Sequence, residues 1–148
     1  EEVVLKFLIV NGPNLNLLGS RETDIYGLET LEEIMSSASR FADQKKITIE
    51  WVQSQHEGVL IEAIQNATKR FQGLIINPAG YGHSSVAIRD ALIAVGLPTV
   101  EVHLSNLARR EEFRHLTLTA DVCVGQICGF GGYGYQLAIS ALAQHIRG

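Results

Sequence analysis

Short apolar runs and longer amphipathic stretches alternate along the chain. The runs are rich in β-branched and aliphatic residues and end at polar or glycine-containing segments, which is typical of strands covered on both faces of a sheet. They predict five strands, at Val3–Val10, Ile47–Val52, Gly73–Ile76, Thr99–Val102 and Asp121–Gly125. A polar stretch over residues 11–27 predicts a long loop after the first strand.

The stretches between these runs place apolar residues three and four positions apart, which predicts helices with one buried face. The buried faces are marked by residues 31–42, 60–71, 88–95 and 135–146. Two pairs, Thr30 with Glu33 and Ser54 with Glu57, have the spacing of a capping box at a helix start. Gly96 and Pro98 favour the end of the third helix, and residues 106–113 are weakly helical.

Strands that alternate with helices indicate βαβ units and a parallel sheet. Because the crossovers of such units are right-handed, few topologies remain, and the order 2-1-3-4-5 of flavodoxin-like three-layer sandwiches fits best. No linker, repeat or low-complexity segment interrupts the pattern, and 148 residues suit one domain. We therefore expect an α/β protein whose residues 1–148 form a single domain. Its ligands should bind beyond the carboxyl ends of the strands.

Charge and hydropathy exclude several classes of function. The net charge of −4 argues against a sequence-independent grip on nucleic acid, which needs a basic surface. No secretory apolar segment opens the chain and no apolar run reaches membrane-spanning length, so we expect a cytoplasmic protein that does not bind membranes. Cys123 and Cys128 lack CxxC spacing and a surrounding His or Cys cluster, which favours small residues in or near the core.

Polar and ionisable side chains gather after the predicted strands. The loop after the first strand holds Asn14, Arg21 and Tyr26. A neighbouring cation favours the phenolate form of a tyrosine, so Arg21 and Tyr26 together can supply a base. The alternative is that Tyr26 packs over the first helix while Arg21 is solvated.

Two further pairs follow later strands. Asn77 and His83 flank a PAGYG turn that leads into a helix, and their neutral donors suit the recognition of hydroxyl groups. Glu101 and His103 alternate on the fourth strand and therefore point to one face, where the carboxylate orients the imidazole and favours its acid form. The alternatives are a structural turn with a loop histidine, and an exposed ion pair at a strand end.

Other charged or glycine-rich segments are more ambiguous. Arginines after the fourth strand can bind a carboxylate, but glutamates among them fit a salt-bridged surface helix equally well; the segment contains Arg109, Arg110, Glu111, Glu112 and Arg114. Asp90 on the third helix is compatible with a solvated position. The GFGGYG run at residues 129–134 is not followed by the acidic residue expected about 20 positions later in a dinucleotide-binding unit.

Four stretches together resemble the type II 3-dehydroquinate dehydratases. They are NGPNLNLLGSRETDIYG (11–27), S-x-HEG (54–58), INPAGYGHSSVAIRDAL (76–92) and VEVHLSNLARREEFRH (100–115), and the match continues in order to the last helix. The resemblance implies a flavodoxin-like enzyme that reversibly removes water from 3-dehydroquinate, through an enolate, to give 3-dehydroshikimate. It also implies that no metal or cofactor takes part, and that the subunits form trimers assembled into a homo-dodecamer.

The resemblance further implies a role for each matched side chain. Tyr26 is the base that removes a C2 proton, Arg21 favours its phenolate from a mobile loop, and Asn14 stabilises the enolate through an ordered water. His103 is the general acid, and Glu101 orients it. The substrate-binding residues are Asn77, His83, Leu104, Ser105 and Arg114, with Asp90 reaching the site of a neighbouring subunit.

Two positions and one stretch depart from the family pattern, the stretch being GQICGFGGYGYQ (125–136), where the family is often more aliphatic. Thr23 stands where proline is frequent, which predicts a looser loop. Gly82 stands where threonine is usual, which predicts a lost hydrogen bond or a less fixed His83.

Two other functions stay open at this point. The first is a flavin-binding or non-catalytic flavodoxin-like module, although Pro13 and the leucines after it do not suit a phosphate loop. The second is a sugar or keto-acid isomerase with the same base and acid. A lysine-imine mechanism is disfavoured, because the lysines lie early in the first strand or near helices.

Overall fold

A parallel β-sheet with helices on both faces organises the chain. In a computed structural model that describes residues 4–148, the strands follow the order β2-β1-β3-β4-β5. Their bounds are β1 (Leu5–Asn11), β2 (Ile47–Gln53), β3 (Gly73–Asn77), β4 (Thr99–His103) and β5 (Gly125–Cys128), and all neighbours pair in parallel. The predicted flavodoxin-like order is confirmed. Val3, the start of the predicted first strand, lies outside the described residues.

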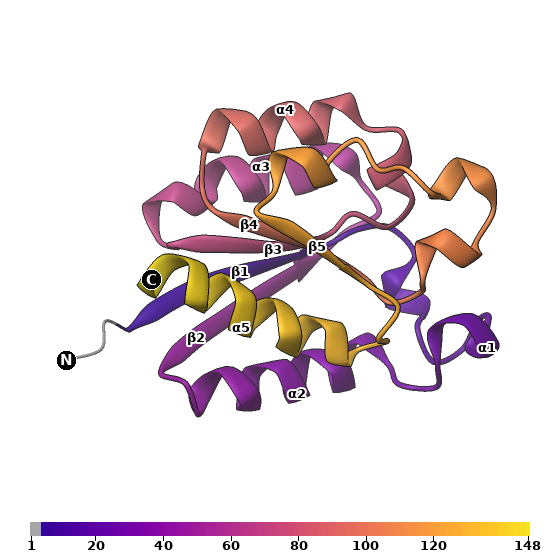
Figure 1. The fold of residues 1–148 in the computed structure, drawn as a ribbon, viewed down its shortest axis with the longest axis horizontal. Coiled ribbons are helices and arrows are strands. Elements are labelled where there is room, and N and C mark those ends of the chain that lie inside the picture. The colour runs from indigo at the N-terminus through magenta and orange to yellow at the C-terminus, as the bar shows by residue number, and fades with distance from the viewer. Residues whose placement is uncertain (1–3) are drawn as a thin grey trace.

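The helices cover both faces of the sheet (Figure 1). On one face lie α2 (Leu31–Asp43) and α5 (Tyr133–Arg147), and on the other lie α3 (Glu57–Asn66) and α4 (Val86–Val95). Each pair of helices closes a hydrophobic core against the sheet. The short α1 (Thr23–Tyr26) stands apart from both layers, at the end of the molecule where the strands finish.

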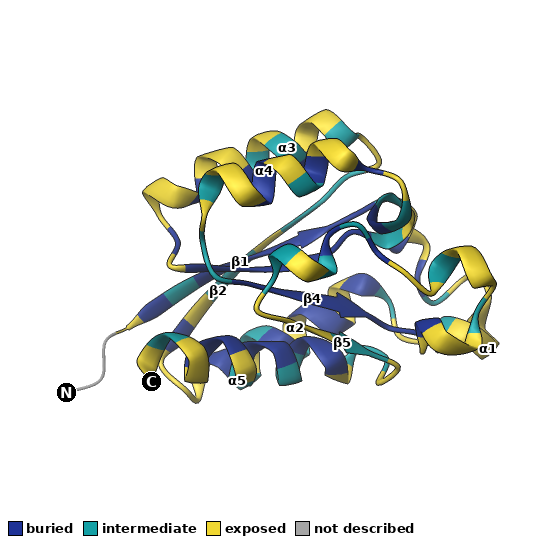
Figure 2. Ribbon diagram, turned by 45° about the horizontal axis from the view of Figure 1, so that its top comes forward, coloured by how far each residue is buried: buried dark blue, intermediate teal, exposed yellow. Residues whose placement is uncertain are grey.

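The central strands are buried, which explains their unbroken apolar sequences. Every residue of β3 and β4 is buried, whereas the outer strands β2 and β5 contain exposed positions. Figure 2 shows the same gradient, from buried strands to the exposed outer faces of the helices. Asn77, Glu101 and His103 are polar residues within these buried strands. Buried polar groups need hydrogen-bond partners, so their surroundings decide what they can do.

Local sequence signals fix the ends of two helices as predicted. Thr30 and Glu33 form a reciprocal capping box at the start of α2. Gly96 adopts a φ of 68° directly after α4, in the left-handed region that glycine tolerates at a helix end.

The second predicted capping box is wrong. α3 begins at Glu57 with His56 as its N-cap, and Ser54 instead accepts a hydrogen bond from the His56 backbone N–H. The Glu57 carboxylate accepts a hydrogen bond from Ser85, the residue that caps α4. A contact between two helix starts therefore replaces the expected local one.

The fifth strand is also misplaced by the sequence prediction. Instead of Asp121–Gly125, the strand is Gly125–Cys128, and the preceding residues Ala120–Val122 form a 3-10 turn. Val122 and Cys123 pack against the core under α3 and α4, so their apolar character serves that core and not the sheet. Residues 106–113, predicted as weakly helical, contribute to short 3-10 turns at Leu107–Arg109 and Glu112–Arg114.

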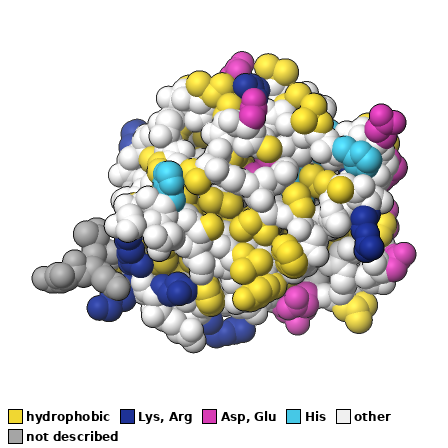
Figure 3. Space-filling view, viewed as in Figure 1, with side chains coloured by type: hydrophobic (Ala, Val, Ile, Leu, Met, Phe, Trp, Pro, Cys, Tyr) yellow, Lys and Arg dark blue, Asp and Glu magenta, His cyan; other side chains and the backbone are white. Residues whose placement is uncertain are grey.

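Basic side chains gather at the end of the molecule where α5 finishes (Figure 3). Lys45, Lys46 and Arg147 line a hollow there. This end is opposite to the carboxyl ends of the strands. None of the helices within residues 4–148 is long and apolar enough to span a membrane.

Candidate active site

A pocket opens at the carboxyl edge of the sheet. Its lining comes from the loop after β1, the turn after β3, and the end of β4 with the segment that follows. The polar residues of this lining are Asn14, Arg21, Tyr26, Asn77, His83, His103, Ser105, Arg110 and Arg114. Parallel strands end at the same edge, which brings together side chains that lie far apart in the sequence.

His103 closes the pocket from the end of β4. Its side chain is 5% exposed, and its Nε2 lies 2.9 Å from Oε2 of the fully buried Glu101. Because this carboxylate accepts a hydrogen bond from Nε2, the other ring nitrogen, Nδ1, is left to exchange a proton with a ligand. The alternating strand positions of the two residues thus form a buried pair and not an exposed one.

Glu101 is held from several directions. Its Oε2 accepts hydrogen bonds from Thr117 Oγ1 at 2.8 Å and from Gln126 Nε2 at 2.7 Å, and its Oε1 accepts one from Thr119. Burial alone raises the pKa of Glu101, but the hydrogen bonds and charge of His103 and the threonine hydroxyls outweigh it, so the pKa falls below the usual 4.5. The carboxylate is therefore a fixed, ionised partner for His103.

Asn77 and His83 form the next part of the wall. Asn77 Oδ1 accepts the backbone N–H of Ala79 at 3.1 Å, within the turn after β3. His83 Nδ1 lies 3.0 Å from the backbone oxygen of Leu116. The rings of His83 and His103 stack with their centroids 6.2 Å apart, so the two imidazoles border the same space.

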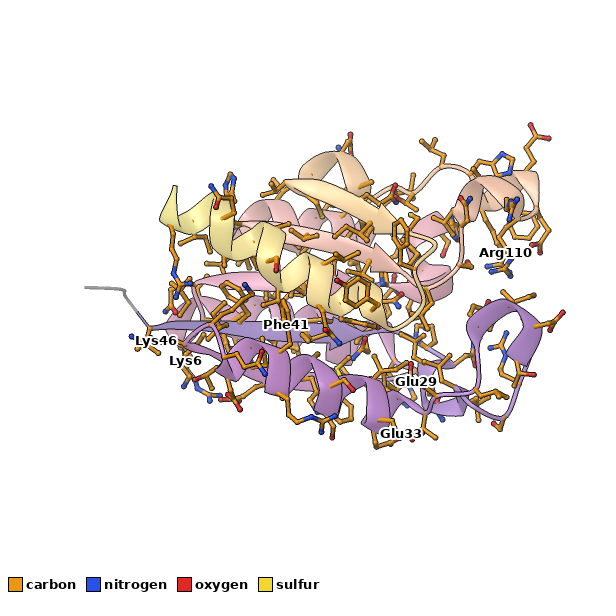
Figure 4. The ribbon with its side chains drawn as sticks, turned by 60° about the horizontal axis from the view of Figure 1, so that its bottom comes forward. Lys6, Glu29, Glu33, Phe41, Lys46 and Arg110 are labelled. Carbon is orange, nitrogen blue, oxygen red and sulfur yellow. The ribbon has the colours of Figure 1, made fainter. Side chains whose placement is uncertain are left out.

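Tyr26 lies on the opposite side, at the end of α1, and two arginines contact it. Nη1 of Arg110 donates a hydrogen bond to the Tyr26 hydroxyl at 3.1 Å, and the guanidinium carbon of Arg21 lies 5.4 Å from the centre of the tyrosine ring. Figure 4 shows Arg110 reaching toward α1 from the segment after β4. Arg110 also donates to Ser105 Oγ at 3.1 Å, which ties Tyr26 to the end of β4.

Most of the chain matches a known protein family. A family described as Dehydroquinase class II matches residues 5–143. A 3-dehydroquinate dehydratase of Sulfurovum sp. is 52% identical over 140 residues, which cover 95% of this chain and 86% of that protein. The chain belongs to the class II dehydroquinase family.

Solved structures agree with this assignment. The type II dehydroquinase from Butyrivibrio crossotus is 48% identical with a TM-score of 0.91, and the match covers 93% of this chain and 97% of that one. The type II dehydroquinase from Propionibacterium acnes also has a TM-score of 0.91, at 37% identity over 97% and 99% of the two chains. Since the related sequences carry the name of a hydro-lyase, the prediction that the chain is an enzyme of that class is confirmed.

The dehydroquinase pocket gathers most of the residues that the sequence singled out. Those that line it are Asn14, Arg21, Tyr26, Asn77, His83, His103, Leu104, Ser105 and Arg114. Glu101 lies behind His103 instead of lining the pocket. Asp90 is exposed on α4 and does not line the pocket of its own chain. The chemical roles of these residues stay predictions.

Arg110 lines the pocket, although the sequence left open whether it binds a ligand or belongs to a salt-bridged surface helix. It lies 84 positions from Tyr26, and its Nε is 3.4 Å from Glu111 Oε1. That neighbour made the segment resemble a salt-bridged surface helix. The available signal was its place after β4, beside Ser105, because residues that follow a central strand at this edge enter the pocket.

Gly82, the unusual residue before His83, has a steric explanation. A Cβ at this position would stand 2.8 Å from Pro78 Cγ and 3.7 Å from His103 Cε1. Any larger residue requires the proline ring to shift, whereas its Cβ would meet the His103 imidazole at an ordinary van der Waals distance. The hydrogen bond that His83 Nδ1 donates to the backbone oxygen of Leu116 holds the ring, although residue 82 has no side chain to help.

The cysteines have no part in the pocket. Burial, with Glu101 and Asp121 nearby, raises the pKa of Cys123 to about 12, and burial also raises the pKa of Cys128. Thiols with a raised pKa are poor nucleophiles. Within residues 4–148, no group of three or more His, Cys, Asp or Glu side chains is placed to hold a metal ion.

Proposed function

We propose that this chain catalyses the reversible elimination of water from 3-dehydroquinate to give 3-dehydroshikimate through an enolate. One observation carries the proposal: a tyrosine with arginine partners and a histidine with a buried carboxylate partner line the same pocket. Elimination next to a ketone needs a base on one side of the substrate and an acid on the other. Tyr26 and His103 supply that pair.

Tyr26 is the base in this proposal. Nη1 of Arg110 donates to its hydroxyl oxygen and the guanidinium of Arg21 lies near its ring, so two cations surround the group that acts as the base. The phenolate takes the proton from C2, and the electrons of that C–H bond pass into the enolate of the C3 ketone. Asn14, which also lines the pocket, stabilises the enolate through a water molecule.

His103 is the acid. As the enolate collapses, its electrons form the C1–C2 double bond and the bond from C1 to its hydroxyl oxygen breaks. The hydroxyl leaves as water with the proton of the His103 imidazolium. Tyr26 has then gained a proton and His103 has lost one, so a net transfer between them through solvent resets the site. Glu101 keeps His103 oriented through its contact with Nε2.

The remaining polar groups of the pocket hold the substrate. Arg114, His83 and Asn77 all belong to the lining. Arg114 and Asn77 offer donors to the ring hydroxyls, whereas His83, whose Nδ1 is bonded to the backbone oxygen of Leu116, offers Nε2 of the neutral ring as an acceptor. The backbone at Leu104 and Ser105 follows directly after β4, close to His103, and binds the carboxylate on C1. This places the leaving hydroxyl, which is also on C1, next to the acid.

Asp90 belongs to the site of a neighbouring subunit in this proposal, within trimers assembled into a dodecamer. Its exposed position on α4, outside the pocket of its own chain, supports that placement. Sedimentation analysis should give a mass twelve times that of the chain, and mixing inactive Asp90→Asn with inactive Tyr26→Phe subunits should restore activity in part. A monomer, or a mixture that stays inactive, contradicts it.

The activity test is the appearance of ultraviolet absorbance when purified protein is mixed with 3-dehydroquinate, because water loss gives a conjugated enone. Tyr26→Phe should lose most of the turnover, whereas Tyr133→Phe, the same change at an exposed tyrosine, should keep it. Product identification by mass spectrometry separates water loss from isomerisation, which leaves the mass unchanged. No enone from the wild-type protein, or near-native turnover by Tyr26→Phe, would overturn the proposal.

A further inference from the structure

Behind the pocket, a chain of buried hydrogen bonds joins the ends of two strands to α5. Asn77 Nδ2, at the end of β3, donates to the Tyr135 hydroxyl at 3.0 Å. The Tyr135 hydroxyl donates to Asn11 Oδ1, at the end of β1, at 2.6 Å. Tyr135 and Asn11 are fully buried, and neither lines the pocket. Only Asn77 of these three residues reaches the ligand space.

The donor and acceptor in each of these hydrogen bonds are fixed by a backbone N–H, which can only donate. The backbone N–H of Ala79 can only donate, so the Asn77 side-chain atom that faces it must be the oxygen. The Asn77 amino group therefore faces Tyr135, whose hydroxyl accepts this bond and passes its own hydrogen to Asn11. Burial raises the pKa of Tyr135 far above its ordinary value, which keeps that hydrogen in place.

The amide of Asn77 is consequently oriented by two contacts on opposite sides. Its oxygen is held by Ala79 and one of its two amino hydrogens by Tyr135. An amide has two such hydrogens, so the second is available to a ligand in the pocket. If the amide rotated, it would offer an oxygen or no aligned group, and a substrate hydroxyl would lose a donor.

We propose that Tyr135 is a positioning residue that holds Asn77 as a hydrogen-bond donor to the substrate. The inference rests on the proposed function, because it takes 3-dehydroquinate as the ligand that Asn77 binds. Tyr135 does not touch the substrate. Its hydroxyl acts through Asn77, and its effect is on substrate binding.

Tyr135→Phe removes the hydroxyl and keeps the ring in the core. The freed Asn77 amide must then be oriented by the substrate itself, which costs about the net free energy of one hydrogen bond, equivalent to a rise in KM of about tenfold. We expect kcat to change by less than about threefold, since the base and acid are untouched. Tyr133→Phe is the matched control, because Tyr133 lies on the same helix and is 56% exposed.

A double-mutant cycle distinguishes positioning from general destabilisation. In the Asn77→Ala background, Tyr135→Phe should leave KM unchanged, since there is no amide left to orient. If Tyr135 had a purely structural role, Tyr135→Phe would instead lower the fraction of active enzyme. The loss would then be the same factor in the wild-type and in the Asn77→Ala protein. An unchanged KM in Tyr135→Phe, or a tenfold rise that persists in Asn77→Ala, overturns the proposal. If Tyr135→Phe does not fold, Asn11→Ala can replace it. This change removes the acceptor of the Tyr135 hydroxyl and should raise KM by about threefold.

A crystal structure of substrate-free Tyr135→Phe gives a readout that is independent of activity. The Asn77 amide should turn away from its wild-type orientation or occupy two orientations. An amide unmoved from Ala79 contradicts the proposal. If wild-type protein and Tyr133→Phe both fail to convert 3-dehydroquinate, the proposed function is wrong, and this structure still decides whether Tyr135 positions Asn77.

Discussion

The two walls of the pocket are built in different ways. The strand wall consists of Asn77 and His103, with Glu101 directly behind His103, and these three residues of β3 and β4 are between 0% and 5% exposed. The loop wall consists of Asn14, Arg21 and Tyr26, which follow β1, and the Arg21 side chain is 36% exposed. α1, which carries Tyr26, has no buried residue.

The difference shows which side chains of the site are held in place by buried hydrogen bonds. Asn77 is fixed by a buried hydrogen bond to α5 and Glu101 by one from Thr119, and His103 is held in turn by Glu101 of the same strand. Tyr26 in the loop wall is joined to the rest of the site through Arg110, across the pocket. Segments with few buried contacts open at low cost in free energy, so we expect α1 with Tyr26 to move more easily than the strand wall. Changes to the two walls should therefore affect stability and rate in different proportions.

The largest expected effect is on the strand wall. His103→Ala should lower kcat by about 10²–10⁴, the usual range for general acid catalysis. It should also lower the free energy of unfolding by about 3 kcal/mol, because Glu101 loses the partner of a buried pair. Steady-state kinetics and urea denaturation measure the two effects. A variant that loses rate but keeps full stability would remove the distinction between the walls.

Glu101→Gln should chiefly lower the free energy of unfolding. The amide keeps the shape, but its amino group faces the donors of Thr117, Thr119 or Gln126, which leaves buried groups unpaired. We expect a loss of about 3 kcal/mol in the free energy of unfolding and a smaller fall in kcat than for His103→Ala. Gln126→Ala, which removes one donor at the sheet edge, is the milder control. A Glu101→Gln protein as stable as the wild type contradicts this account.

On the loop wall, Arg21→Ala should lower kcat by about tenfold and change the free energy of unfolding by less than about 0.5 kcal/mol. The guanidinium near Tyr26 is lost, but no buried contact depends on it. Arg109→Ala is the matched control, because Arg109 is exposed and does not line the pocket. Equal kinetic effects of the two variants would show that Arg21 acts only through overall charge.

The smallest effect is a pH dependence of stability that comes from Glu101. Its folded-state pKa is below the usual 4.5, so its ionisation stabilises the fold above that pH, and this contribution is lost as pH falls through the folded-state pKa. The difference in unfolding free energy between wild type and Glu101→Gln should therefore shrink as the pH falls below 4.5. Denaturation at a series of pH values measures it. A difference that is constant or grows with acidity contradicts the predicted sign.

The sequence predicted the strand wall better than the loop wall. Strand β4 could be recognised from its apolar run, and two residues spaced by two on a strand must share a face, so Glu101 and His103 were expected together. The partners that fix Glu101 could not be foreseen. Thr117 and Thr119 lie in a segment without periodic pattern, and Gln126 belongs to a strand predicted four residues too early.

The other contacts that were not predicted join residues far apart in the sequence. Arg110 meets Tyr26 only after the chain has completed most of the sheet, and its local neighbours are glutamates. Glu57 has the right spacing to cap its own helix with Ser54, yet Ser85 of another helix start takes its carboxylate. The expected dodecamer and cytoplasmic location stay predictions, because a single chain contains no contact that decides them.

Exchange of the C2 proton in heavy water tests most directly whether Tyr26 and His103 act as separate base and acid on the two walls. With His103→Ala in D₂O, the remaining 3-dehydroquinate should gain deuterium at C2 faster than it loses water, as measured by mass spectrometry. Tyr26→Phe should show neither process above the uncatalysed rate. Rapid deuterium incorporation by Tyr26→Phe, or none by His103→Ala, would contradict the division of labour between the two walls.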